Sequence, residues 1–498
     1  MIPVNETNNL ETLFNNDKLK IHYYCDEYVL ATAGVFNFEG IVVLDDNAFT
    51  NSASYAVVYC DNHYKNEYLT KTSKSGKKLY SGENFLIMQI PSGDFMPANN
   101  DGMVIITDVE ARLPQATVEY PLVTEQDKNV LGFLEQVSTE KLMGYIQTLQ
   151  DFETRFCAHP NAVAAQNWIT EQYESFGLEV FVQDFTLPPT FQYDSSSDNV
   201  IAIQRGTDFP DEYVVCGAHY DSFTFESIDN APGADDNASG TAGILETARI
   251  LSQYDFKRSI IYCSFSAEER GLIGSSYYAQ QCAEQDINIV GYFNLDMTGY
   301  LTPGNEIHID LIYPSTAQTL ANYYINICDV YFPDVPLREF SSLPGGNSDH
   351  TSFNNNGFMG VWSFEDVNEI SPYIHRIPGI NPDTQFEYLG DIIGPSVNNP
   401  AQVTLFTKAN LACVATLSIP DIKPITQKNI IYPNPAEDKI IINGDFIGQY
   451  AAIFDINGKL VANKLINSNI FEIDISNLTG GMYVVKISNK VIGKFAKK

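Results

Sequence analysis

The sequence predicts an α/β fold in which a largely parallel sheet lies between helices, with a β-rich region on either side of it along the chain. Two observations predict the central fold. Residues 129–418 contain short, continuously apolar runs, and these runs alternate with helical repeats. Such runs indicate strands that are covered on both faces, and their alternation with helices is typical of an α/β layer fold. Residues 1–128 and 427–498 carry β-type runs instead, with a linker over residues 419–426.

The predicted strands of the central region are rich in Val, Ile and aromatic residues, which favour strands. They cover residues 199–205, 212–218, 259–267, 288–297, 306–312 and 358–366. The predicted helices cover residues 164–176, 241–254, 271–285 and 317–330. In the second of these, Ile244, Ala248 and Leu251 recur at helical spacing.

The two flanking regions read as mostly strand. In the first, apolar runs cover residues 27–36, 40–46, 54–60 and 101–113, separated by Asn, Asp, Gly and Ser. No acid/base pair or ligand spacing occurs there, so we expect an accessory domain or a pro-domain. In the second, runs at 439–443, 449–461, 470–476 and 481–488 predict a small β-sandwich, with Asn457-Gly458 as a hairpin signal.

Charge and hydropathy exclude several classes of protein. The chain has 29 Lys+Arg and 62 Asp+Glu, a net charge of −33, which disfavours nucleic acids and anionic membranes as partners. No apolar run reaches the ~18 residues of a membrane span. Residues 421–498 hold 10 Lys and 7 acidic residues, a net charge of +3, so residues 1–420 carry −36. This break in composition supports a domain boundary there.

The eight cysteines form no CxxC pair, so a cysteine zinc site is not expected. Cys216 and Cys263 lie in apolar strand-like runs and are expected to be buried thiols.

Metal-ligating side chains recur where the predicted strands end. They are His219, Asp221, Asp236, Glu268, Glu269, Asp296 and His375. Because sites in open α/β sheets form at the carboxyl ends of the strands, we expect these side chains to converge. Acidic groups directly after apolar runs are costly to desolvate unless cations pair with them.

Two histidines among several carboxylates suit zinc. Two ions need one bridging carboxylate, and one His and one carboxylate each. The inventory matches with His219 and Asp296 on one ion, Glu269 and His375 on the other, and Asp236 between them.

Glu268 is then left over. Two metals polarise a carbonyl and acidify a water molecule, and an unligated carboxylate can accept that proton as general base. Asp221, two residues after His219, is placed to accept the other imidazole N–H.

These motifs resemble the M28 family of di-zinc metallopeptidases, and most closely its bacterial leucyl-type aminopeptidases. The resemblance covers roughly residues 130–418. It rests on GAHYDS (217–222), PGADDNASG (232–240), SAEERGLIGS (266–275), LDM (295–297), SDHTSF (348–353) and PYIHRI (372–377). TLQDFETRF (148–156) and AAQNWITEQYESFG (164–177) look like the family's opening helices. The resemblance implies a phosphorylase/hydrolase-like fold, with a twisted mixed sheet between helices.

The resemblance also implies the ligand roles given above, with Asp236 rather than Asp235 as the bridge. It places Met297 and Phe364 near an apolar substrate pocket. His350 is a rival for the last ligand position, which the resemblance assigns to His375. The sequence departs from the bacterial relatives at residues 344–347, where Pro-Gly-Gly-Asn replaces a stretch with cysteines and a Tyr.

The C-terminal region resembles the type A sorting domain of type IX secretion in Bacteroidetes. The resemblance rests on YPNPAEDKI (432–440), FDINGKLV (454–461), GGMYVVKI (480–487) and the basic ending GKFAKK. It implies export by the type IX secretion machinery to the surface or the medium. The alternative is a general β-sandwich adhesion module.

The sequence therefore predicts a secreted aminopeptidase with two Zn²⁺ ions, acting on peptide or protein N-termini. Two alternatives share the scaffold: a glutaminyl cyclase, and a non-catalytic peptide-binding protein. Carboxypeptidase or dipeptidase action within the family also stays open. The preferred N-terminal residue, the role of residues 1–128, the disulfides and the oligomeric state are not predicted.

Overall fold

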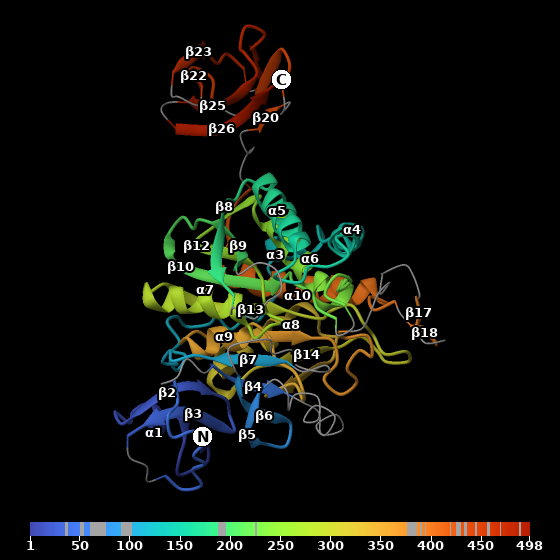
Figure 1. Ribbon diagram of the computed structural model, residues 1–498. Helices are drawn as coiled ribbons and strands as arrows, with labels where there is room; N and C mark the ends of the chain where they lie inside the picture. The colour runs from blue at the N-terminus through green and yellow to red at the C-terminus, as the bar shows by residue number, and fades with distance from the viewer. Residues whose placement is uncertain are drawn as a thin grey trace. The chain divides into compact units, whose positions relative to one another are not determined.

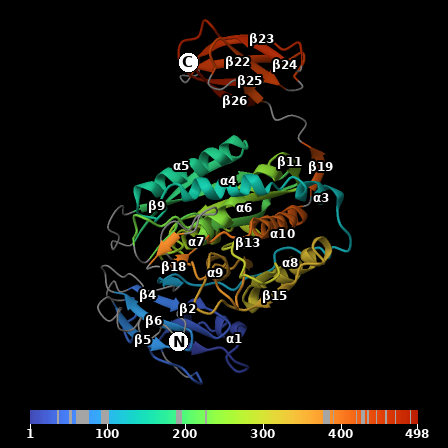
Figure 2. The ribbon, with the colours of Figure 1, turned by 90° about the vertical axis from the view of Figure 1, so that its right-hand side faces the viewer.

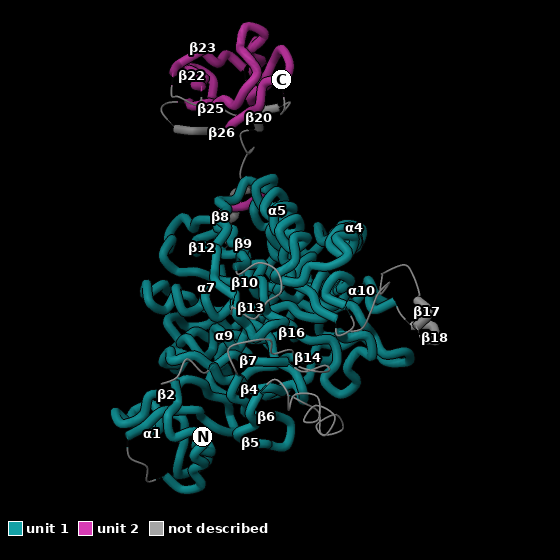
Figure 3. Tube along the Cα trace, in the orientation of Figure 1, with its two compact units in different colours: residues 1–252, 256–421 teal, residues 253–255, 422–498 magenta. Residues whose placement is uncertain are grey.

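The computed structural model has two compact units, coloured separately in Figure 3. Unit 1 comprises residues 1–252 and 256–421, and unit 2 comprises residues 253–255 and 422–498. The structure describes residues 1–34, 38–49, 54–59, 76–90, 102–187, 196–224, 227–375, 386–388, 391–393, 395–418, 420–424, 430–432, 436–443, 446–455, 459–468, 470–487 and 490–498.

A mixed eight-stranded sheet is the centre of unit 1, in the order β15-β14-β16-β13-β10-β12-β9-β8. Its strands are β8 (Glu179–Thr186), β9 (Ser196–Gln204), β10 (Phe209–His219), β12 (Arg258–Phe265), β13 (Asn288–Leu295), β14 (Ile309–Ile312), β15 (Leu337–Phe340) and β16 (Gly360–Phe364). The inner strands β12, β10, β13 and β16 run parallel, whereas β9 and β14 pair antiparallel with their inner neighbours. All six strands predicted for this region exist, and the α/β class with a mixed sheet is confirmed.

Helices cover both faces of this sheet (Figures 1 and 2). They are α3 (Lys128–Leu134), α4 (Thr139–Gln150), α5 (Pro160–Ser175), α6 (Gly240–Leu251), α7 (Ile273–Glu284), α8 (Gln318–Tyr331), α9 (His350–Asn355) and α10 (Pro400–Ser418). Along β10, Tyr213 and Val215 pack with residues of α7 and α9. The intervening Val214 and Cys216 face the other side, and both are fully buried. Continuous apolar strands therefore reflect burial on two faces.

The four predicted helices of this region correspond to α5, α6, α7 and α8. The helix implied over TLQDFETRF is wrong beyond its first three residues, because α4 ends at Gln150. Arg155, just after that end, is fully buried and donates hydrogen bonds to the backbone oxygens of Leu149, Tyr220, Pro232 and Gly233. These hydrogen bonds hold the segment after α4 in a conformation other than a continued helix.

The N-terminal part of unit 1 is β-rich, as predicted. It contains a three-stranded sheet of β1 (Ile2–Pro3), β3 (Tyr28–Ala33) and β2 (Leu19–Tyr24), and a four-stranded sheet of β5 (Lys77–Ser81), β6 (Phe85–Ile90), β4 (Ser54–Tyr59) and β7 (Met103–Ile106). A short helix, α1, spans Leu10–Phe14. The strand predicted over residues 40–46 is wrong, because this segment has no regular structure. Its Val42 oxygen instead accepts a hydrogen bond from the Met1 amino group.

Unit 2 contains two sheets that share one apolar core. The first is β20 (Ile430–Tyr432), β21 (Lys439–Asn443) and β24 (Ile470–Asp474), and the second is β23 (Leu460–Leu465), β22 (Tyr450–Asp455), β25 (Gly481–Ile487) and β26 (Lys490–Lys497). Ile440 and Ile473 of the first sheet cluster with Ile453 and Val485 of the second. The Asn457-Gly458 hairpin signal lies outside the described residues.

Two further two-stranded sheets pair β11 (Tyr254–Phe256) with β19 (Pro420–Pro424) and β17 (Phe386–Tyr388) with β18 (Asp391–Ile393). Cys216 and Cys263 are buried thiols, as predicted, and the seven described cysteines are all free. Within the described residues, we find no helix that is long and apolar enough to cross a membrane.

Candidate active site

The predicted site residues meet at one edge of the central sheet. His219 is the last residue of β10, and its register partner Phe265 ends β12, three residues before Glu268. Asp296 directly follows β13, which pairs with both β10 and β16. The parallel register of these strands therefore brings together side chains that lie far apart in the sequence.

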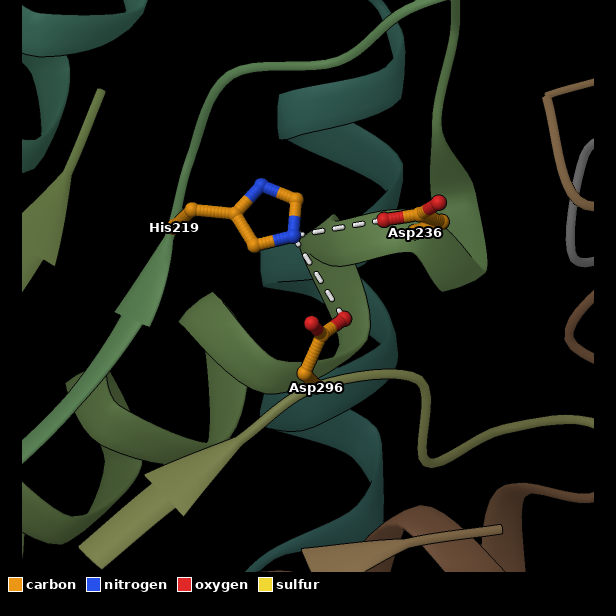
Figure 4. A group of neighbouring side chains, drawn as sticks. All are labelled: His219, Asp236 and Asp296. Carbon is orange, nitrogen blue, oxygen red and sulfur yellow. Dashed lines mark ion pairs between the residues drawn. The ribbon is translucent and has the colours of Figure 1, made fainter. Parts of the chain in front are cut away.

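Asp236 lies between the two histidines, in the segment that leads into α6. Its Oδ1 is 3.3 Å from Nε2 of His219, and its Oδ2 is 3.2 Å from Nε2 of His375. Each carboxylate oxygen of Asp236 thus faces a different imidazole. Figure 4 shows Asp236 and Asp296 both directed at the ring of His219.

One further carboxylate completes each half of the site. Oδ1 of Asp296 is 3.4 Å from Nε2 of His219, and Oε2 of Glu269 is 2.7 Å from Nε2 of His375. His219, Asp236 and Asp296 form one group whose ligand atoms lie within 4.8 Å of one another, and Asp236, Glu269 and His375 form a second. The two groups share Asp236.

Glu268 stands beside these groups and belongs to neither of them. Its Oε2 is 4.0 Å from Nε2 of His219, and its backbone N–H donates to Oδ1 of Asp221 at 3.1 Å. The same Asp221 oxygen lies 3.4 Å from Nδ1 of His219. Asp221 therefore contacts both the strand-end histidine and the turn that carries Glu268.

Burial shapes the electrostatics of the site. It raises the pKa of Glu269 to about 7, and the nearby charge of Asp236 adds to this rise. It also raises the pKa of Glu268 well above its usual range, against the opposing effect of His219. For Asp236, burial acts in the same direction, but hydrogen bonds from His219 and His375 outweigh it and lower the pKa.

Both imidazoles respond to these carboxylates. Burial lowers the pKa of His375, but the charge of Glu269 and the hydrogen bond to Asp236 outweigh it, so the pKa lies well above its usual value. The pKa of His219 is raised against its burial by Asp296 and Glu268. The site therefore binds positive charge, either as protons on the imidazoles or as cations between them and the carboxylates.

The donor set fits divalent metal ions. Within the described residues, Oε1 of Glu269 is buried and accepts no hydrogen bond, which leaves a lone pair for a cation. Two imidazoles with three carboxylates match the N/O ligands that zinc takes.

A cavity of about 320 Å³ opens onto these groups. Asp236, Glu268, Glu269, Asp296 and His375 form its polar end. Met297 and Phe364, the residues expected near a substrate pocket, both line it, together with Leu343, Trp362 and Ile370. The cavity can hold a group that has a charged or polar end and an apolar body.

His350, the rival ligand, does not join the cluster. Its ring packs 5.4 Å from that of Trp362, and burial lowers its pKa to about 3. Ser348, two residues before His350, does contact the cluster. Its Oγ donates a hydrogen bond to Oδ2 of Asp296 at 2.6 Å.

Several features of the site had no clear signal in the sequence. Met297 and His375 adopt the left-handed backbone region, with φ of 54° and 50°, which non-glycine residues rarely occupy. Strained backbone of this kind gathers at functional sites. Trp362 and Leu343, which line the cavity, look like ordinary core residues in the sequence.

A third group of ligand-type side chains, His308, Asp310 and Asp366, lies elsewhere in unit 1. Arg338 already occupies it, because its Nη2 is 2.6 Å from Asp310 Oδ2 and 2.8 Å from Asp366 Oδ1. The guanidinium supplies the positive charge that a metal would bring, so this cluster is an ion-pair network.

Comparison with known proteins matches two parts of the chain to families. Residues 199–379 match the model of peptidase family M28, and residues 430–498 match that of a secretion system C-terminal sorting domain. The second match indicates export to the cell surface or the extracellular space.

Individual relatives agree with the first match. A probable zinc metalloprotease of Phaeosphaeria nodorum is 32% identical over 218 residues, which are 37% of this chain and 44% of that protein. Aminopeptidase YwaD of Bacillus subtilis is 31% identical over 201 residues, 39% of this chain and 41% of its own length. The matched stretch thus spans less than half of either relative.

Among solved structures, LapB from Legionella pneumophila superimposes with a TM-score of 0.56 at 21% identity. The superposition covers 73% of this chain and 99% of LapB, and it supports the fold. The two family matches and the side chains gathered at the sheet edge agree: residues 199–379 are similar to peptidase family M28, and residues 430–498 are similar to a secretion system C-terminal sorting domain.

Proposed function

We propose that this protein is a secreted zinc-dependent aminopeptidase that binds two zinc ions. One observation carries the proposal: the two oxygens of Asp236 face two different imidazoles, of His219 and His375, at 3.3 and 3.2 Å. A carboxylate in this position can bridge two cations. His219 and Asp296 would complete the first ion's ligands, and Glu269 and His375 the second's.

The identity of the metal rests on the donors and on the relatives. Zinc takes imidazole and carboxylate ligands readily, and an open position at the cavity is what a catalytic zinc site needs. The relative in Phaeosphaeria nodorum carries the name probable zinc metalloprotease. Both lines of support point to the same ion.

The chemistry follows from Glu268. Zinc held by these residues would supply Lewis acidity that polarises the peptide carbonyl and lowers the pKa of the attacking water. Glu268 borders the cavity and its side chain is only 11% exposed, so its carboxylate can accept a proton from the attacking water and pass it to the leaving amine. Nδ1 of His219 lies 3.1 Å from the backbone oxygen of Asp221 and 3.4 Å from its Oδ1, so Asp221 would hold the imidazole in a fixed orientation.

The cavity favours a peptide N-terminus as substrate. A free α-ammonium is attracted to the acidic end, where Glu268 and Asp296 lie. The apolar lining from Met297 and Phe364 then suits an apolar side chain on the first residue. The name of the relative aminopeptidase YwaD agrees with this substrate.

Export is assigned to the C-terminal region. Residues 430–498 match a secretion system sorting domain, and we infer that the type IX machinery recognises it. The peptidase would then act on extracellular peptides or protein N-termini.

A panel of chromogenic substrates tests the proposed function. Free and N-acetylated aminoacyl anilides are assayed with and without a chelator, alongside a substrate with N-terminal glutamine. We expect the free anilides to be hydrolysed, the blocked ones to be spared and the chelator to abolish activity. Equal cleavage of blocked and free substrates contradicts aminopeptidase action, and release of a cyclised product from the glutamine substrate would indicate a glutaminyl cyclase.

A further inference from the structure

The N-terminal β-rich segment contributes a wall to the candidate active-site cavity. Gly102 and Met103, where β7 begins, line the same cavity as Glu268 and Asp296. These two residues lie nearly one hundred positions before the first residue of the matched peptidase family, residue 199. The cavity is therefore built from residues 1–128 and residues 129–418, two regions that the sequence predicts to be separate domains.

Gly102 lets β7 approach the loop of residues 343–347, which forms another side of the cavity. Its backbone N–H donates to the oxygen of Gly345 at 3.4 Å. A Cβ atom on Gly102 would lie 2.8 Å from the backbone nitrogen of Asn347, closer than real Cβ contacts come. The close approach of the two backbones thus requires glycine at this position.

The other end of β7 is held against the turn that carries the proposed general base. The backbone N–H of Ile105 donates to the oxygen of Gly271 at 3.3 Å, three residues after Glu268. Gly271 has a φ of 110°, and a Cβ there would lie 2.5 Å from Cγ1 of Ile105. The strand is consequently held at two points, one on the loop that lines the cavity and one on the turn that follows Glu268.

Met103 is the apolar side chain that this strand brings to the cavity. It is 5% exposed and packs in one cluster with Val58, Leu86 and Met88 of the same sheet. It also lines the cavity that Met297 and Phe364 line. A long thioether chain in this place takes up volume that a substrate side chain would otherwise fill.

We propose that Met103 is a specificity-determining residue, which limits the size of the apolar side chain that the substrate's first residue can place in the cavity. This inference rests on the proposed aminopeptidase function. It makes the N-terminal β-rich segment a working part of the substrate cavity. Shortening Met103 should enlarge the cavity and favour substrates with larger side chains.

The test compares kcat/KM for alanyl, valyl, leucyl and phenylalanyl anilides in the full-length enzyme. We expect Met103→Ala to raise the phenylalanyl-to-alanyl ratio by about 10-fold or more, since one methylene group in an apolar pocket changes specificity by about 10- to 200-fold. Met103→Leu, with a similar volume, should keep a ratio near that of the wild type. Met103→Val replaces the alanine variant if that one does not fold, with a smaller shift in the same direction.

Met88→Ala is the matched control. Met88 belongs to the same apolar cluster and is 1% exposed, but it does not line the cavity. It should lower stability as Met103→Ala does and leave the substrate ratio unchanged. A ratio that stays at the wild-type value in Met103→Ala, or in Met103→Val where that variant replaces it, overturns the proposal, and so does an equal shift in Met88→Ala. A wild-type enzyme that cleaves none of the four anilides overturns the proposed function, and the role of Met103 with it.

Discussion

The backbone N–H of Glu268 donates a 3.1 Å hydrogen bond to the Asp221 carboxylate, and the accepting oxygen also lies 3.4 Å from Nδ1 of His219. The Asp221 carboxylate thus contacts both the proposed general base and a proposed zinc ligand, and the backbone oxygen of Asp221 lies 3.1 Å from the same Nδ1. Because Asp221 is itself fully buried, its negative charge acts on both neighbours with little screening by solvent.

Asp221→Asn should lower kcat by about 10- to 100-fold, the usual cost of losing an outer partner of a metal-binding histidine. The amide can orient His219 but carries no charge. Steady-state kinetics at saturating zinc would measure this loss. Asp211→Asn, at an exposed position of the same strand β10, is the control and should behave as the wild type. An Asp221→Asn enzyme with full activity would remove the positioning role.

Glu268→Gln should keep its zinc and lose hydrolysis by about 10²- to 10⁴-fold, because glutamine has the same shape but cannot accept the proton. Zinc content by elemental analysis and kcat on a leucyl anilide are the two readouts. Glu269→Gln should differ from it by losing zinc, since Glu269 lies 2.7 Å from His375 in the ligand group. Retained activity in Glu268→Gln would refute the base assignment.

Asp236→Ala should lower the affinity for both ions, because each oxygen of this carboxylate serves one ligand group. Asp296 belongs to only one of the two ligand groups, so Asp296→Ala should leave the ion at Glu269 and His375 bound. A calorimetric titration with zinc measures the number of ions bound and their affinities, and so distinguishes the two variants. If Asp236→Ala still binds two equivalents with unchanged affinity, the carboxylate does not bridge.

Local sequence patterns predicted much of this fold and of this site. The apolar runs of β10, β12, β13 and β16 located the strands, and the polar residues that follow each run located the site. These patterns are formed by residues that are close together in the sequence, so a single sequence is enough to reveal them.

Features that arise from packing between distant segments could not be predicted from the sequence. Helix α10 was missed because most of its residues are buried on all sides, so it shows no apolar stripe at helical spacing. Ser348 and Asp296, 2.6 Å apart, are 52 residues apart in the chain, and no local pattern joins them. Gly102 and Met103 likewise reach the cavity only through the docking of β7.

Removal of zinc should lower the thermal stability as well as the activity. A ligand that binds only the folded state stabilises it by RT ln(1 + [L]/Kd), which is about 2.7 kcal/mol at a free concentration of 100 Kd. Scanning calorimetry with and without chelator measures the change in Tm, and added zinc should restore both Tm and turnover. A chelated enzyme that keeps its Tm and its activity would exclude a metal from the site.

Anomalous scattering at the zinc absorption edge, from crystals grown with zinc, tests the central claim most directly. We expect two peaks, one contacted by His219 and Asp296 and the other by Glu269 and His375, with Asp236 contacting both. A single peak, or peaks that Asp236 does not contact, would contradict it.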